Sequence, residues 1–293
     1  MPRALLQSGI ELEYDTIGSP DDEPLLLVMG FTAQLIAWPD DFCKMLADAG
    51  RYVIRFDNRD CGLSTKFDGQ VPDVVAVMTA LATGQPVPPV PYTLSDMAAD
   101  AVGLLDHLGI ERAHVVGASM GGMIVQTMAI EHPQRLRSMV SVMSTTGEPT
   151  VGQAAPEAIS VLLSPPPTDR DEFIAAAPRF LVFQSKKYAD VERSKLMAAA
   201  SYDRSFYPEG ASRQLGAIAA SGSRAALLPT VSVPTLVIHG RDDTLIQPSG
   251  GERTAELIPG AHLLLVADMG HDLPEPLWPI VVGAIVTHTA NAA

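Results

Sequence analysis

The pattern Gly-x-Ser-x-Gly occurs once in this chain, and its position constrains the fold more than any other sequence feature. It spans residues 117–121 with Ser119 at its centre, between an apolar run that begins at Ala113 and a helix-like segment that runs to Glu131. A strand that turns abruptly into a helix holds the residue at the turn in a strained conformation, and flanking glycines keep the turn free of clashes. The sequence therefore predicts a strand–turn–helix unit that exposes the Ser119 hydroxyl beside a helix N-terminus, as a candidate nucleophile.

Strand-like and helix-like segments alternate on both sides of this turn. Residues 10–14 alternate like an early antiparallel strand, residues 38–49 indicate a helix, and Thr93 is positioned to cap a helix over residues 94–108. Apolar runs typical of buried strands occupy residues 25–29, 52–56, 139–143 and 233–240. Such alternation implies right-handed crossovers and a mainly parallel sheet that is covered by helices on both faces.

A serine nucleophile needs a base and a group that orients the base, and both types of residue follow predicted strands downstream. Asp243 lies in the loop after the strand at 233–240, and His271 lies in the loop after an apolar run at 262–266. The carboxyl ends of parallel strands meet at one edge of a sheet, where open α/β folds place their sites. We therefore expect Ser119, His271 and Asp243 to converge.

Several neighbouring residues compete for these roles. Asp242 adjoins Asp243, and spacing alone leaves either as the acid. His239 is the nearest rival base because it also lies at a strand end, while Asp268 and Asp272 are expected to face solvent or cap the loop that carries the histidine. The other five histidines have sufficient structural roles: His107, His114, His132, His262 and His288.

The apolar run at 25–29 ends at Gly30, and Phe31 opens the loop beyond it. In strand–nucleophile–helix sites, one backbone N–H that binds the oxyanion comes from the residue after the nucleophile and another from the loop after an early strand. Met120 and Phe31 are therefore the predicted donors of an oxyanion hole, acting through their main chains. Gly30 permits the backbone to turn toward the substrate, although a glycine there also suits an ordinary turn that ends a strand.

The motifs together resemble the α/β-hydrolase superfamily over nearly the whole chain. They are GASMGG at 117–122, RFDNRDCGLS at 55–64, HGRDD at 239–243 and GH at 270–271. Residues 27–30, 38–39 and 58–60 look most like the aclacinomycin methylesterase group of small carboxylesterases. Two features depart from the superfamily pattern: Met29 replaces the usual histidine before the oxyanion glycine, and Asp60-Cys61 stands where a glycine is frequent.

This resemblance implies an α/β-hydrolase fold, with a mainly parallel eight-stranded sheet flanked by helices and a helical cap. It also implies ester hydrolysis without a cofactor, with Ser119 as nucleophile, His271 as base and Asp243 as the acid. Enzymes that keep the same triad remain alternatives, namely cofactor-free perhydrolases or haloperoxidases and C–C bond hydrolases, as does a small-ligand receptor without catalysis. Haloalkane dehalogenases and epoxide hydrolases resemble enzymes with Asp at the nucleophile position, so Ser119 counts against both.

The strand–helix pattern breaks between residues 145 and 230, where proline-separated helical pieces predict a cap inserted into a core of residues 1–144 and 231–293. Its apolar side chains either line an acyl or alcohol pocket above Ser119 or pack within the cap. They are Phe173, Phe180, Leu181, Val182 and Phe183. A proline-rich loop at 84–92 is a further candidate for the edge of the entrance.

Composition fits a single large core, because 47% of the 293 residues are hydrophobic. The net charge of −14 disfavours nucleic acid and anionic membrane surfaces as partners. The partner that the family resemblance implies is a small ester. Two cysteines, Cys43 and Cys61, are too few for a disulfide framework, and the N-terminus lacks an apolar leader. No apolar stretch is long enough to span a bilayer, and no cluster has the ligand spacing of a metal site. We expect a cytoplasmic protein without a metal or cofactor; the sequence leaves its oligomeric state and its natural ester open.

Overall fold

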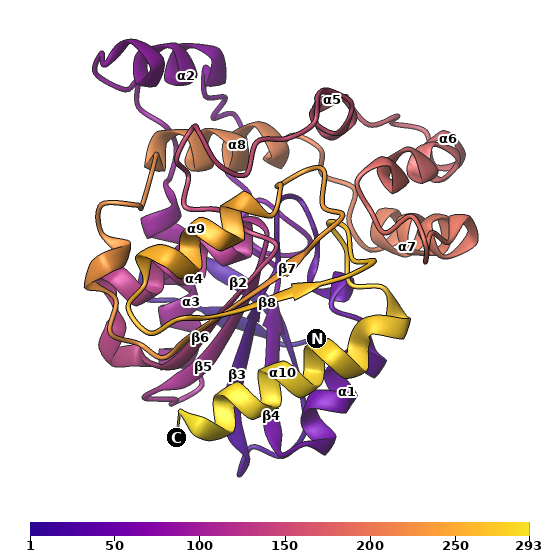
Figure 1. The fold of residues 1–293 in the computed structure, drawn as a ribbon. Helices are drawn as coiled ribbons and strands as arrows, with labels where there is room; N and C mark the ends of the chain where they lie inside the picture. The colour runs from indigo at the N-terminus through magenta and orange to yellow at the C-terminus, as the bar shows by residue number, and fades with distance from the viewer. Residues whose placement is uncertain (293) are drawn as a thin grey trace.

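The computed structural model describes residues 1–292 and is built on one eight-stranded sheet (Figure 1). Its strands are ordered β1-β2-β4-β3-β5-β6-β7-β8. They are β1 (Arg3–Leu5), β2 (Glu11–Ile17), β3 (Glu23–Val28), β4 (Arg51–Phe56), β5 (Ala113–Ala118), β6 (Leu136–Val142), β7 (Thr235–Gly240) and β8 (His262–Val266). β2 is antiparallel to both of its neighbours, whereas the six strands from β4 to β8 run parallel. The predicted fold class is confirmed.

Helices cover both faces of the sheet because successive strand residues point to opposite sides. On one face Leu26 and Val28 of β3 pack in a core with α3 (Leu94–His107), α4 (Met120–Glu131) and α9 (Ser249–Leu257). On the other face Leu25 and Leu27 pack with α1 (Asp40–Asp48) and α10 (Trp278–Asn291). Both clusters are almost fully buried, so the central strands form a rigid platform for the loops at their ends.

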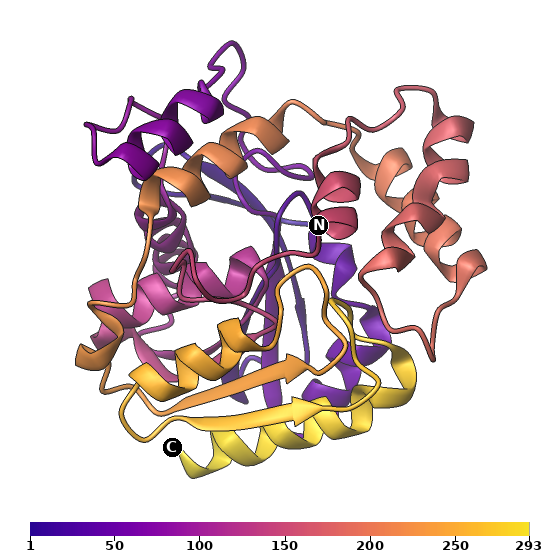
Figure 2. The same ribbon diagram turned by 45° about the horizontal axis from the view of Figure 1, so that its top comes forward.

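Residues 145–230, which we name the β6–β7 insertion, leave the sheet after β6 and return before β7. Its main helices are α5 (Pro156–Leu163), α6 (Arg170–Ala176), α7 (Val191–Arg204) and α8 (Gly210–Ser221). Short 3-10 helices are η1 (Leu35–Ala37), η2 (Pro133–Arg135), η3 (Ala177–Val182), η4 (Leu228–Thr230) and η5 (Glu275–Leu277). Figures 1 and 2 show the insertion helices gathered on one side of the molecule, with α2 (Val74–Thr83) beside α8.

Two buried ion pairs join the insertion to the core. Arg204 at the end of α7 lies 2.7 Å from the Asp57 carboxylate, and Arg213 of α8 lies 2.8 Å from the Asp60 carboxylate. Both carboxylate side chains are fully buried, and Asp60 also accepts a hydrogen bond from Tyr92. Removing one partner of a buried pair leaves an uncompensated charge and typically costs about 3–5 kcal/mol. These pairs therefore fix the insertion against the loop after β4.

Local signals account for most element boundaries. Thr93 and Asp96 form the capping box at the start of α3, as the sequence predicts. The predicted helix from residue 38 begins later, at Asp40, because Trp38 has an extended backbone and Pro39 is the N-cap. The helix α2 is not predicted from the sequence, although the Asp73 side chain caps its start and a left-handed Gly84 ends it. Among the helices of residues 1–292, none combines the length and apolar character needed to cross a bilayer.

Candidate active site

Ser119 lies at the sharp turn between β5 and α4. Its backbone has φ 56° and ψ −118°, a conformation that L-residues rarely adopt, which stores about 1–3 kcal/mol of strain. A Cβ on Gly117 would lie 2.1 Å from the carbonyl oxygen of Gly121, and a Cβ on Gly121 would lie 2.0 Å from that of Val28. Only glycine fits at these two positions, so the Gly-x-Ser-x-Gly pattern reflects the geometry of this turn.

The structure brings Ser119, His271 and Asp243 together, as the sequence predicts. His271 Nε2 lies 3.0 Å from Ser119 Oγ, and His271 Nδ1 lies 2.7 Å from Asp243 Oδ2. The His271 side chain is 8% exposed and the Asp243 side chain is fully buried. The three side chains thus form one continuous hydrogen-bonded series from the hydroxyl to the carboxylate.

Asp243 is held as a carboxylate by its surroundings. Its Oδ1 accepts the N–H groups of Leu245 and Ile246, each at 2.9 Å. Burial acts to raise the pKa of Asp243, but His271 and His239 outweigh burial and lower it to about 2. Asp242 is exposed, so the structure brings Asp243, rather than its neighbour, to the histidine.

His239, the rival base, contacts the acid. It is fully buried, with Nε2 2.8 Å from the carbonyl oxygen of Ile246 and 3.4 Å from Asp243 Oδ2. Within residues 1–292, the hydroxyl of Ser119 forms a hydrogen bond with the imidazole of His271 and none with that of His239. Asp243 therefore lies between two imidazoles, of which one reaches the serine.

The predicted oxyanion loop borders Ser119. A Cβ on Gly30 would lie 3.0 Å from Ser119 Cβ and 3.5 Å from its Oγ, so the loop passes directly beside the hydroxyl. In the described part of the chain, the backbone N–H groups of Phe31 and Met120 donate to no protein acceptor. Two unpaired backbone donors that flank a serine are suited to binding a negatively charged oxygen.

The insertion contributes a contact to His271 that is not predicted from the sequence. The carbonyl oxygen of Phe183 accepts the N–H of His271 at 2.7 Å, and the two rings pack edge to face with centroids 6.1 Å apart. Asp272 Oδ1 accepts the N–H groups of Ser185 and Gly270, which joins the insertion to the His271 loop. Asp272 thus caps the loop, as expected. Asp268, instead of facing solvent alone, pairs with Lys187 at 2.6 Å.

Phe173, the first residue of the predicted pocket set, lies elsewhere in the insertion. Phe173 packs against Tyr202 and Phe206, with ring centroids 5.4 and 5.6 Å apart. Phe180 packs on Phe183 at 5.8 Å. Phe183 is therefore the member of the set with a ring contact to the candidate base.

Two further histidines and both cysteines have structural surroundings. His114 is fully buried with Nδ1 2.8 Å from Ser138 Oγ, and burial lowers its pKa to about 4. His288 Nε2 lies 3.2 Å from the carbonyl oxygen of Pro234. Burial raises the pKa of the free thiols of Cys43 and Cys61 to about 12, so both stay protonated at neutral pH. No group of three His, Cys, Asp or Glu within residues 1–292 is arranged to hold a metal ion.

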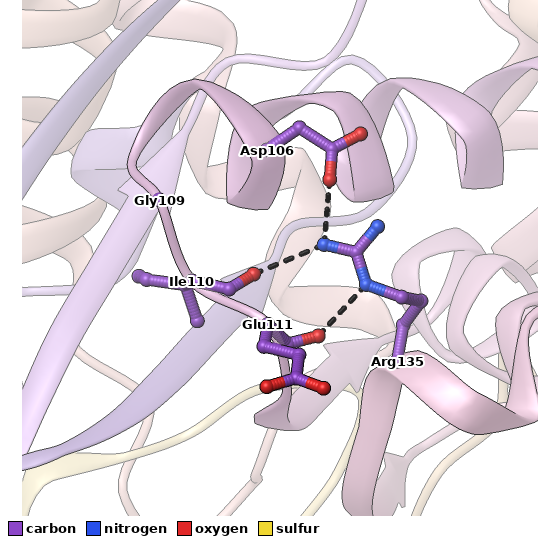
Figure 3. Close-up of a pocket in the computed structure, with 5 residues that line it drawn as sticks. All are labelled: Asp106, Gly109, Ile110, Glu111 and Arg135. Carbon is purple, nitrogen blue, oxygen red and sulfur yellow. Dashed lines mark hydrogen bonds and ion pairs between the residues drawn. The ribbon is translucent and has the colours of Figure 1, made fainter.

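A surface hollow of about 280 Å³ lies away from this site (Figure 3). It is lined by Asp106, Gly109, Ile110, Glu111 and Arg135. The Arg135 guanidinium donates to the backbone oxygens of Ile110 and Glu111 and pairs with Asp106. The hollow adjoins the amino end of β5, whereas Ser119 follows its carboxyl end, so the length of β5 separates the two.

The family of the chain follows from a sequence profile. The profile described as alpha/beta hydrolase fold matches residues 23–275, which contain Ser119, Asp243 and His271. The chain belongs to this family.

The alpha/beta hydrolase is also similar to individual proteins over its whole length. It is 28% identical over 313 aligned residues to a rhodomycin D methylesterase of Streptomyces sp., covering 99% of this chain and 98% of the relative. This similarity confirms the resemblance to small methylesterases that the motifs indicate. Two solved structures share the fold: a meta-cleavage product hydrolase of Pseudomonas fluorescens (TM-score 0.78, 21% identity, 100% and 98% coverage) and an enol-lactonase of Burkholderia xenovorans (TM-score 0.73, 24% identity, 99% and 100% coverage).

The structure shows the surroundings of the two positions at which this alpha/beta hydrolase departs from the superfamily pattern. The carbonyl oxygen of Met29 accepts a hydrogen bond from the side-chain N–H of Asn58 at 2.8 Å. This contact uses the main chain of residue 29 and does not depend on its side chain. Asp60 has φ 61° and is held by Arg213 and Tyr92. The strained turn at Asp60 thus has anchors that the sequence alone does not reveal.

Proposed function

We propose that this enzyme is a serine carboxylesterase. The observation that carries the proposal is the hydrogen-bonded series Ser119–His271–Asp243, with distances of 3.0 and 2.7 Å, beside two unpaired backbone donors. A neutral imidazole whose Nδ1–H is held by a carboxylate presents its Nε2 lone pair to the hydroxyl, which is the tautomer needed in a general base. No protein group within residues 1–292 uses the Phe31 and Met120 donors.

The reaction follows from these positions. Ser119 Oγ attacks the ester carbonyl carbon while its proton moves to His271 Nε2, and the N–H groups of Phe31 and Met120 stabilise the oxyanion. Collapse of this intermediate breaks the bond to the alcohol, which leaves with the proton from His271. Water then attacks the acyl-enzyme, gives a proton to His271 and releases the acid, and the proton returns to Ser119. Asp243 keeps the imidazole oriented and stabilises its charged form.

Methyl esters are proposed among the substrates, since a relative that matches 99% of this chain is named a rhodomycin D methylesterase. We also propose that the β6–β7 insertion acts as the cap of the site, with residues 1–144 and 231–293 as the core. The contact of Phe183 with His271 supports a cap that excludes water from the reacting atoms.

The test is a panel of methyl and p-nitrophenyl esters of graded acyl length, assayed with the wild type and Ser119→Ala. Short or medium acyl esters are expected to be hydrolysed, and the variant should lose at least about a thousandfold in kcat, as for removal of a triad nucleophile. Ser212→Ala, at a half-buried position near the start of α8 where the hydroxyl donates to the carbonyl oxygen of Glu209, is the matched control. Unchanged turnover by Ser119→Ala would refute the proposed nucleophile.

Two parallel assays address other reactions that the same three residues support. One measures peracid formation from acetate and hydrogen peroxide, and the other measures C–C cleavage of a diketone. Turnover of either kind that exceeds ester hydrolysis would replace the esterase assignment with a perhydrolase or a C–C bond hydrolase.

A further inference from the structure

The loop that follows β3 reaches Ser119 on one side and the insertion on the other. Gly30 contacts Ser119, and two residues later the N–H of Thr32 donates to Gln214 Oε1 of α8 at 2.8 Å. Gln214 Nε2 donates in turn to the carbonyl oxygen of Arg59 at 2.9 Å. The Gln214 side chain is therefore a bridge between the oxyanion loop and the loop after β4.

The backbone at Thr32 needs external support. Its φ is 56°, in the left-handed region that a β-branched residue rarely occupies. Such conformations persist where surrounding contacts over-determine them. The contacts on the Thr32 peptide groups are the amide of Gln214 at its N–H and the Cys61 thiol, a weak donor, at its carbonyl oxygen, 3.2 Å away. The stronger of these two hydrogen bonds is the one to Gln214, a residue of the insertion.

A second attachment lies further along the same loop. Gln34 Nε2 donates to the carbonyl oxygens of Ser201 and Ser205, at 2.7 and 2.9 Å, and its Oε1 accepts from Arg204. These groups belong to α7 and the residue after it, so two insertion helices hold one loop. The attachment at Gln34 is three residues from Phe31, whereas Gln214 acts on the peptide group that directly follows Phe31.

We propose that Gln214 is a positioning residue that sets the direction of the Phe31 N–H for the oxyanion. This inference rests on the proposed esterase function. Gln214 is fully buried, and its amide supplies an acceptor for Thr32 and a donor for Arg59 at opposite ends. An apolar side chain of similar length would leave both backbone groups unpaired. The peptide group that carries the Thr32 N–H would then rotate so that this N–H could reach another acceptor. The direction of the adjoining Phe31 peptide would change with it.

The test compares the wild type with Gln214→Met on p-nitrophenyl butyrate, with trifluoroacetophenone as a probe that forms an oxyanion on the serine. We expect kcat to fall on the order of 10- to 100-fold, below the loss for complete removal of an oxyanion donor. KM should stay within about threefold, and the inhibition constant of the probe should rise by about the same factor as kcat falls. Ser212→Ala on the same helix is the control and should match the wild type.

Two further measurements keep the outcome clear. If Gln214→Met does not fold, Gln214→Ala replaces it, because the vacated volume admits water to pair the two backbone groups, and a smaller loss with the same parallel change is expected. A folded variant with kcat within twofold of the wild type, or one that loses kcat while binding the probe normally, overturns the role of Gln214. Ser119→Ala is assayed alongside: if it remains active the esterase proposal fails, and if it is inactive while Gln214→Met is unaffected, only the positioning role fails.

Discussion

Replacing Asp243 with asparagine is expected to reduce kcat about 10⁴-fold while leaving the fold intact. Asparagine can still accept the N–H groups of Leu245 and Ile246 through its oxygen, since that contact uses one carboxylate oxygen only. Its NH₂ group then faces His271 Nδ1, where Asp243 Oδ2 lies at 2.7 Å in the native enzyme. A donor at this position selects the tautomer with the proton on Nε2, which cannot accept the proton of Ser119.

The same substitution has a calculable effect on stability. Lowering the pKa of the buried Asp243 from 3.8 to about 2 corresponds to roughly 2 kcal/mol of stabilisation by the charged form. Because the folded pKa is the lower one, this contribution is complete above about pH 4 and disappears as the pH falls toward 2. Asp243→Asn should therefore lower the free energy of unfolding at pH 7 by about that amount, and the difference from the wild type should shrink in acid.

Steady-state kinetics on a p-nitrophenyl ester and urea unfolding at pH 7 and pH 3 measure the two effects. Asp242→Asn is the matched control, since it makes the same chemical change at an exposed neighbour, and its kcat should stay within a few-fold of the wild type. An Asp243→Asn enzyme with more than a tenth of the wild-type kcat would refute the tautomer argument. A larger loss in Asp242→Asn would transfer the role to that residue.

Two predictions concern histidines. His271→Ala should abolish nearly all activity, together with the rise of kcat/KM from acidic to neutral pH. His239→Ala should keep the shape of that pH profile, but its melting temperature should fall because a buried ring is lost. A wild-type pH profile in His271→Ala would make His239 the next candidate base. His114→Val should make the stability of the protein less sensitive to acid. Because burial lowers the pKa of His114 from 6.5 to about 4 in the folded state, roughly 3 kcal/mol of stability is lost as the pH falls from 6.5 to 4. The free energy of urea unfolding should therefore differ less between pH 7 and pH 4.5 in the variant than in the wild type. Equal acid sensitivity in both proteins would contradict the second expectation.

The site residues from the core could be predicted because they follow strands. Parallel strands end at one edge of the sheet, so the loops with Ser119, Asp243 and His271 had to meet wherever the apolar runs were identified correctly. Spacing alone left the choice between Asp242 and Asp243 open; the family resemblance favoured Asp243, and the structure shows that its carboxyl group is the one that turns inward to His271. Spacing in the sequence does not encode that direction.

Residues contributed by the insertion could not be predicted in the same way. Gln214 and Phe183, the latter a member of the predicted pocket set, lie in a segment whose helices are separated by prolines and turns, so no periodicity links their positions to the sheet. Their contacts with His271 and Thr32 join residues that are 88 and 182 positions apart in the sequence. Contacts of this kind depend on the path of the whole insertion. The helix α2 was missed for a simpler reason, because its apolar residues lack a polar face that would mark an amphipathic pattern.

The ion pairs of Arg204 with Asp57 and of Arg213 with Asp60 limit how the insertion can be exchanged. A chain that joined residue 144 directly to residue 231 would retain the residues of all eight strands but lose both arginines, so Asp57 and Asp60 would be left without these ion-pair partners. A graft of another insertion onto this core would meet the same difficulty unless it supplied an arginine at both places, or unless Asp57 and Asp60 were replaced together with it. Changes in substrate range are therefore expected to arise from substitutions within the insertion, such as around Phe183, more readily than from replacement of the whole segment.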